Sequence, residues 1–169
     1  KNSVNVMFIG GLGQVSDVIS LIKFAKIFYD KVDKRFNFII VGDGPKKTKC
    51  IQFAQKYKLT NVEFRDSVAK SEIPKLQENS DILVACTTYS KVYRFGSNFN
   101  KVYDYMASGT PVIISSNVTD DPISKSKSGY LVKPQRPLLI YNVLCEYIKL
   151  DPKDRKKMGE NGLNYVTEY

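Results

Sequence analysis

Short apolar runs alternate with longer amphipathic segments along this chain, and this alternation constrains its fold more than any other feature. The apolar runs cover residues 4–9, 36–41, 61–64, 82–85, 112–114 and 130–132. Runs of this length read as buried strands, and the segments between them repeat their apolar residues at helical spacing. Strands that alternate with helices require a parallel sheet covered on both faces. We therefore predict an α/β protein: a single Rossmann-like α/β/α domain over residues 1–169.

Helix signals fill the spaces between these runs. The first helix is predicted from an apolar stripe of Val18, Leu21, Ile22, Ala25 and Phe28. Further helices are predicted over residues 46–57, 71–78, 99–107, 138–150 and 153–166. Asp151 and Pro152 form an N-cap and N1 pair before the last of them.

The loops that follow the predicted strands mark the expected ligand site. In parallel sheets ligands bind outside the carboxyl ends of the strands. Residues 10–13, 42–45, 87–89 and 115–116 all fall there. The first turn is rich in glycine, so the backbone at Gly11 and Gly13 can approach a phosphate closely. The turn at Gly42 is either purely structural or part of the ligand site.

The turn at residues 11–16 also comes close to a dinucleotide-binding fingerprint, with Ser16 in place of its last glycine. The acidic residues that follow, Asp30 and Asp33, end a helix pattern rather than a second strand. The dinucleotide interpretation is therefore the weaker one.

The helix predicted over residues 99–107 carries a cation and a carboxylate near its start. Ser97 and Asn98 are suitable N-caps, and Gly109 suits a left-handed C-terminal position. Lys101 and Asp104 are three residues apart, so they share a helix face. Beside free backbone N–H groups they can hold a phosphate and a sugar hydroxyl. The alternative is an exposed ion pair worth a few tenths of a kcal/mol.

Composition narrows the classes of function. The net charge of +9 favours anions such as nucleotide-sugars, acidic lipid or nucleic acid, although it also fits simple solubility. Neither an aromatic platform for single strands nor a recognition helix is evident, so we expect no nucleic-acid partner. The basic cluster at residues 153–157 is either a solvated helix face or a contact with anionic lipid.

Cysteine and histidine usage excludes some chemistry. The chain has no His, which rules out His-based triads and His-ligated zinc within it. Cys50, Cys86 and Cys145 are isolated and odd in number, so reduced, mostly buried thiols in a cytoplasmic protein are expected. The chain opens on Lys without a Met and enters a strand pattern at once, so we expect a domain of a longer protein.

Residues 93–113 read Tyr-Arg-Phe-Gly-Ser-Asn-Phe-Asn-Lys-Val-Tyr-Asp-Tyr-Met-Ala-Ser-Gly-Thr-Pro-Val-Ile. This segment resembles the donor site of retaining GT-B glycosyltransferases of the bacterial capsule and lipopolysaccharide type. Asn100 and Lys101 match the asparagine-lysine pair of that family, and Asp104 matches its acidic residue. The resemblance implies that Lys101 is the main residue that stabilises the donor diphosphate, with Arg94 as its candidate helper, while Asp104 holds the ribose.

The resemblance extends from about residue 4 to residue 169, and it assigns further roles. Backbone N–H groups from Ser97 to Asn100 would bind phosphate, and the segment ending at Val68 would line the base pocket. Arg65 in that segment would either stack on the base or remain exposed. The family's paired cations at the glycine turn are absent, with Gly11 and Ser16 in their places, and Gly96 replaces its sugar-binding glutamate.

These matches imply the C-terminal, donor-binding half of a glycosyltransferase that uses a nucleotide-sugar, most simply UDP-linked. Transfer would proceed with retention to an envelope polysaccharide at the inner face of the cell membrane. The acceptor would bind a missing N-terminal domain, so this half would bind donor without turnover. No metal is expected. The alternatives are half of a sugar-nucleotide epimerase, whose usual His is lacking here, and a non-enzymatic basic binding module.

Overall fold

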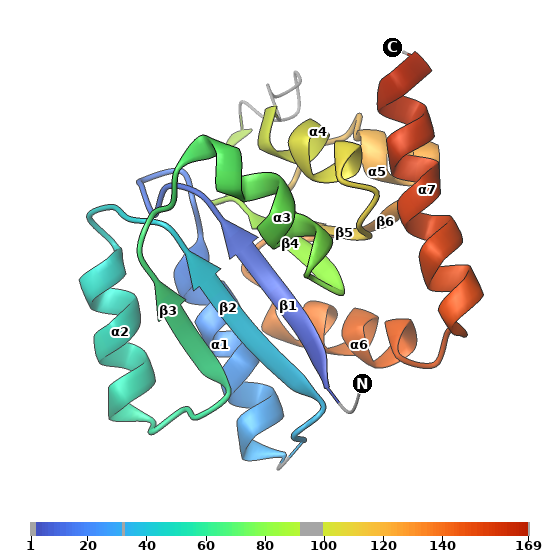
Figure 1. Cartoon of the computed structure of the whole chain (residues 1–169). Helices are drawn as coiled ribbons and strands as arrows, with labels where there is room; N and C mark the ends of the chain where they lie inside the picture. Colours follow the sequence, from blue (N-terminus) through green and yellow to red (C-terminus); the bar gives the residue numbers. More distant parts are fainter. Residues whose placement is uncertain (1–2, 32, 92–99, 169) are drawn as a thin grey trace.

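The computed structural model describes residues 3–31, 33–91 and 100–168, and within them it forms one α/β/α sandwich (Figure 1). Its six strands are β1 (Val4–Ile9), β2 (Phe36–Val41), β3 (Val62–Arg65), β4 (Ile82–Cys86), β5 (Val112–Ser115) and β6 (Gly129–Val132). They pair in parallel in the order β3-β2-β1-β4-β5-β6. The predicted fold class is confirmed.

The helices cover both faces of this sheet (Figure 1). They are α1 (Val18–Asp30), α2 (Lys47–Lys56), α3 (Ile73–Glu78), α4 (Asn100–Ala107), α5 (Pro122–Ser126), α6 (Pro137–Tyr147) and α7 (Pro152–Glu168). Alternate strand residues point to opposite faces. Phe8 therefore belongs to the core beneath α1, α2 and α6, whereas its neighbours Met7 and Ile9 belong to the core beneath α4 and α5.

Aromatic packing fixes α1 and α6 on the first face. The Phe28 ring centroid lies 4.4 Å from that of Phe36, 5.7 Å from that of Phe38 and 4.7 Å from that of Tyr141. Such tilted ring pairs contribute roughly 0.5–1.5 kcal/mol each beyond their burial. This cluster packs beside the amino-terminal half of β1, because Phe36 and Phe38 pair with Val4 and Val6.

Tyr105 joins α4 to the end of β1 on the second face. Its buried hydroxyl accepts a hydrogen bond from the Ile9 backbone N at 2.9 Å and donates one to the Ile9 carbonyl at 2.8 Å. The first turn of α4 is thereby held beside the turn that follows β1.

Most predicted elements lie within one or two residues of their expected bounds, and two details differ. Helix α5 was not predicted, because five residues are too few for a helical repeat to show. The basic cluster of α7 is not wholly solvated, since Arg155 donates to the carbonyls of Ile148 and Leu150 at 2.7 and 3.1 Å. Lys153, Lys156 and Lys157 remain exposed.

Other local expectations are met. Gly109 has the left-handed φ of +68° predicted for the end of α4. The Asp151 carboxylate caps α7 through the Asp154 backbone N at 2.9 Å. The three cysteines are free thiols, with Cys50 and Cys86 buried and Cys145 half-buried.

None of the helices in the described ranges is long and apolar enough to cross a membrane.

Candidate functional site

Two turns at the carboxyl ends of β1 and β2 are bound together and form the floor of the candidate site. The Gly10 backbone N donates to the Val41 carbonyl at 2.9 Å, and the Leu12 backbone N donates to the Asp43 carbonyl at the same distance. Gly42 has a φ of +141°, and a Cβ there would lie 2.1 Å from the Gly10 carbonyl oxygen. Only glycine fits at position 42, which favours the structural interpretation of that turn.

Gly11 and Gly13 differ from Gly42 in having no steric need for glycine. A Cβ at either position would meet nothing within 4 Å. Their backbone therefore borders open space at the edge of the sheet, which is where the sequence places a phosphate.

Lys101 extends from the first turn of α4 to this glycine turn. Its ammonium nitrogen lies 4.1 Å from the centroid of the Phe8 ring. It also lies against Gly10, where an added Cβ would come within 2.5 Å of it. Neither a hydrogen bond nor an ion pair links Lys101 to the residues that the structure describes.

Burial lowers the pKa of Lys101 to about 8. Withdrawing an ammonium from water without a partner disfavours its charged form. The predicted alternative, an exposed pair with Asp104, does not describe this lysine, because it is largely buried and the two side chains form no ion pair in the described structure. A largely buried cation with no counter-ion among the described residues, beside open backbone, is suited to binding an anion.

Asp104 lies one turn further along α4 and is exposed. It lines a cavity of about 680 Å³ between α3 and α4, together with Lys70, Ile73 and Gln77. The carboxylate is therefore free to accept hydrogen bonds from hydroxyl groups.

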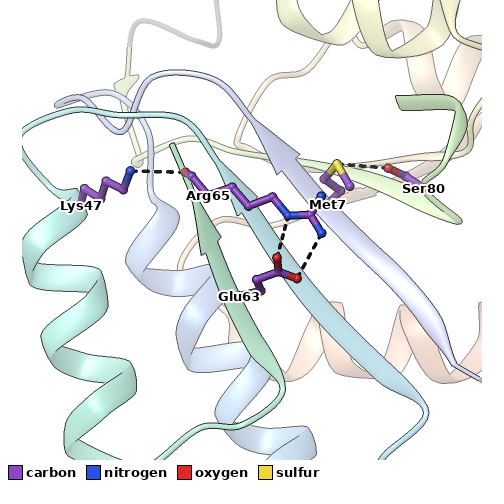
Figure 2. A network of polar contacts seen from close by, with 5 residues as sticks. All are labelled: Met7, Lys47, Glu63, Arg65 and Ser80. Carbon is purple, nitrogen blue, oxygen red and sulfur yellow. Dashed lines mark hydrogen bonds and ion pairs between the residues drawn. The ribbon is translucent and has the colours of Figure 1, made fainter. Parts of the chain in front are cut away.

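The predicted base-binding segment follows β3, and its charged side chains already have partners (Figure 2). Arg65 donates to the Glu63 carboxylate at 2.7 and 3.2 Å. Lys47 donates to the Arg65 carbonyl at 3.3 Å and forms an ion pair with Asp66 at 2.7 Å. Val68 packs its side chain against the core. What this segment offers to a ligand is mainly its backbone.

The remaining predicted residues are placed only in part. Asn100 is the exposed first residue of α4, whereas Arg94, Ser97 and Asn98 lie outside the described residues. In the described ranges no three His, Cys, Asp or Glu side chains gather as a metal ion would need.

Sequence reasoning missed two residues that position Lys101. Phe8 supplies the ring beneath its ammonium group, and Tyr105 ties α4 to β1. The spacing held a signal for Tyr105: it follows Lys101 by four residues, which places both on one helix face.

The six-stranded parallel sheet, in the order β3-β2-β1-β4-β5-β6, matches the Rossmann-like half of a GT-B fold. The family model "Glycosyl transferases group 1" matches residues 1–165, and the chain belongs to that family. No relative is found among curated proteins.

Solved structures share this fold at low sequence identity. TarM from S. aureus, crystallised with UDP among its ligands, superposes with a TM-score of 0.80 at 18% identity over 99% of this chain and 33% of its own. The C-terminal domain of LpcC, a glycosyl transferase group 1 family protein from Francisella tularensis, gives 0.75 at 21% identity, over 98% and 85%. HepE from Anabaena, in complex with UDP and glucose, gives 0.77 at 18% identity, over 99% and 44%. The chain thus spans only about a third of the length of TarM.

Proposed function

We propose that this chain is the donor-binding half of a glycosyltransferase and holds a nucleotide-sugar, with UDP as the nucleotide, at the carboxyl ends of its strands. The observation that carries the proposal is Lys101: a largely buried ammonium group that has no counter-ion among the described residues, held over Phe8 beside the glycine turn. A diphosphate in the open space at Gly11 and Gly13 would supply the missing negative charge.

The chemistry follows from the position of that charge. When a sugar leaves a nucleotide-sugar, negative charge grows on the departing diphosphate, and a fixed cation in a site of low dielectric stabilises it. Lys101 has this role in the proposal, and it needs no reorganisation because Tyr105 and Phe8 already hold its helix and its ammonium group. The protein's contribution is electrostatic, as in other transfers where the leaving group carries the charge.

The nucleoside would lie toward β3. The exposed Asp104 carboxylate would accept hydrogen bonds from the ribose hydroxyls, beside the cavity between α3 and α4. The backbone of residues 65–68 would contact the base, because the side chain of Arg65 is already engaged by Glu63. UDP in the TarM and HepE structures supports the choice of nucleotide.

Transfer with retention to an envelope polysaccharide is the finer part of the proposal. Its support is the match of residues 93–113 to the donor segment of retaining enzymes that build such polymers. In this scheme the acceptor is held mainly by a separate N-terminal domain. LpcC, whose C-terminal domain was solved alone, illustrates such a division of the chain.

Calorimetric titration of the folded domain with UDP, GDP and a mixed-sequence oligonucleotide tests the proposal. UDP should bind more tightly than GDP, and the oligonucleotide should bind weakly and lose its affinity as salt is added. Preferential binding of the oligonucleotide would favour the basic-module alternative. A folded domain that binds no nucleotide at millimolar concentration would overturn the donor-site proposal.

A further inference from the structure

A second cavity lies on the other side of the candidate donor site. Its volume is about 760 Å³, and it is formed by the loops that follow β4, β5 and β6. The lining comprises Tyr89 after β4, Ser116, Asn117 and Val118 after β5, and residues 133–136 after β6. The strand order places these loops at the edge opposite β3.

The order of the strands determines how a bound nucleotide-sugar would be oriented across the sheet. With the base near β3 and the diphosphate at the β1 turn and Lys101, the sugar would project toward β4 and the loops beyond it. The second cavity is therefore on the side from which an acceptor would approach that sugar. This step rests on the proposed function.

The cavity carries positive charge that nothing in the described structure neutralises. Lys133 and Arg136 both line it, both are exposed, and no ion pair joins either to a described residue. Arg136 also precedes α6, whose start has no side-chain cap. The free N–H groups and the dipole at a helix start favour an anion as well.

Polar and apolar groups complete the lining. Ser116 is 2% exposed, and its hydroxyl has no hydrogen-bond partner in the described part of the chain. Asn117 is fixed, because its amide donates to the Ser90 carbonyl at 2.7 Å and accepts from the Ser90 backbone N at 3.1 Å. Tyr89 is 58% exposed, so its ring offers a flat apolar surface. An aromatic face with nearby polar groups suits a sugar ring, which has one apolar side and hydroxyl groups around its edge.

We propose that this cavity is an acceptor subsite for an anionic saccharide. The sugar ring packs against Tyr89, and its carboxylate or phosphate group is held by Lys133 and Arg136. The hollow shape and the fixed Asn117 favour a small charged sugar over a flat lipid surface.

The test is a titration of the chain with three probes, in the presence and absence of saturating UDP. The probes are a tetragalacturonate (carboxylates), a glycerol-phosphate oligomer (phosphates) and the neutral maltotetraose. The wild-type chain should bind at least one anionic probe, and the preferred one identifies the charged group. Maltotetraose should bind more weakly, and added salt should weaken the anionic probe because exposed charges are screened.

Paired variants locate the site. Lys133→Gln with Arg136→Gln should weaken the anionic probe by about tenfold, as expected for two exposed charge contacts. Lys153→Gln with Lys157→Gln removes the same charge from α7 and should leave binding within about twofold. UDP binding should be unchanged in both.

Several outcomes overturn the inference. One is UDP binding without binding of either anionic probe, which leaves the donor-site proposal intact. Another is an equal loss in both double variants, which would show that only net charge matters. A third is recruitment of the chain to phosphatidylglycerol vesicles through Lys133 and Arg136 with no binding of either oligosaccharide. If the folded wild-type chain did not bind UDP at all, that result would contradict the proposed function rather than this inference.

Discussion

The two ends of the candidate donor site differ in how their charges are compensated. At the phosphate end, Lys101 is largely buried and unpaired in the described structure, and burial lowers its pKa to about 8. At the base end, Arg65 is held twice by Glu63, and Lys47 is held by Asp66. The first end needs a ligand to complete it, whereas the second is already complete. A cation near a predicted site is therefore informative only when its partners are known.

The largest effect is expected from Gly42→Ala, which disrupts the contact between the turns after β1 and β2 at the phosphate end of the site. The new methyl group would lie 2.1 Å from the Gly10 carbonyl oxygen, at a φ of +141°. The free energy of unfolding should fall by about 3 kcal/mol or more, through both clash and backbone strain. Chemical denaturation measures it.

Gly11→Ala is the matched control, because a Cβ there meets nothing within 4 Å. Its free energy of unfolding should change by less than about 0.5 kcal/mol. Equal destabilisation by the two alanines would contradict the account of the turn.

The next effect is on ligand binding at the two ends. Lys101→Ala should weaken UDP binding by about 1.5–3 kcal/mol, a tenfold loss or more, because a charge-assisted contact disappears. Uridine should bind as before, since it has no phosphate. Asp104→Asn should weaken uridine and UDP alike through the ribose. Titration of each variant with both ligands separates the two roles, and equal losses for uridine and UDP in Lys101→Ala would contradict them.

The pKa of Lys101 predicts opposite pH dependences for folding and for binding. The folded pKa of about 8 is below the ordinary 10.5, so the folded state disfavours the ammonium form. That cost is fully present below pH 8 and disappears as pH rises from 8 to 10.5. The difference in pKa sets a ceiling of about 3 kcal/mol, and the water that still reaches this largely buried group reduces the cost to about 1–2 kcal/mol.

The ligand-free domain should therefore become more stable over this window, and Lys101→Met should remove the rise. UDP binding should weaken over the same window, because neutral Lys101 no longer attracts the diphosphate. Denaturation and titration between pH 7 and 10 measure the two trends. A stability of the wild-type chain that falls as steeply as that of the Met variant would show that Lys101 is not the group responsible.

A feature could be predicted from the sequence when the residues that determine it are close together in the sequence, and not when they are far apart. Strands β1 and β2 and the left-handed Gly109 follow from local patterns, and all three were predicted. The contact of Lys101 with the Gly10 turn follows only from topology, which brings the carboxyl ends of parallel strands together. The Tyr105 hydrogen bonds to Ile9 join residues 96 apart, so no local pattern reports them.

Two further features had weaker signals. Glu63 and Arg65 are two apart in a strand, so they share one face, and their pairing was available from that spacing. The cavity after β4, β5 and β6 depends on the shapes of three loops, including a left-handed Gln135 with a φ of +58°. Nothing in the residue types reports such a shape.

The smallest predicted effect comes from removing the ion pair between Glu63 and Arg65 at the base end of the site. Glu63→Gln removes the charge that holds Arg65, and the pair is exposed, so the free energy of unfolding should change by less than about 1 kcal/mol. UDP affinity should stay within about twofold, because the backbone of residues 65–68 rather than the guanidinium is expected to contact the base. Denaturation and UDP titration measure both quantities, with Arg65→Ala as the companion variant. If Glu63→Gln raised UDP affinity severalfold and Arg65→Ala abolished that gain, Arg65 would be a base-stacking residue that Glu63 restrains. In that case a cation would contact the ligand at both ends of the site. The ends would differ only in that Glu63 holds Arg65 in the ligand-free protein, whereas Lys101 has no such partner among the described residues.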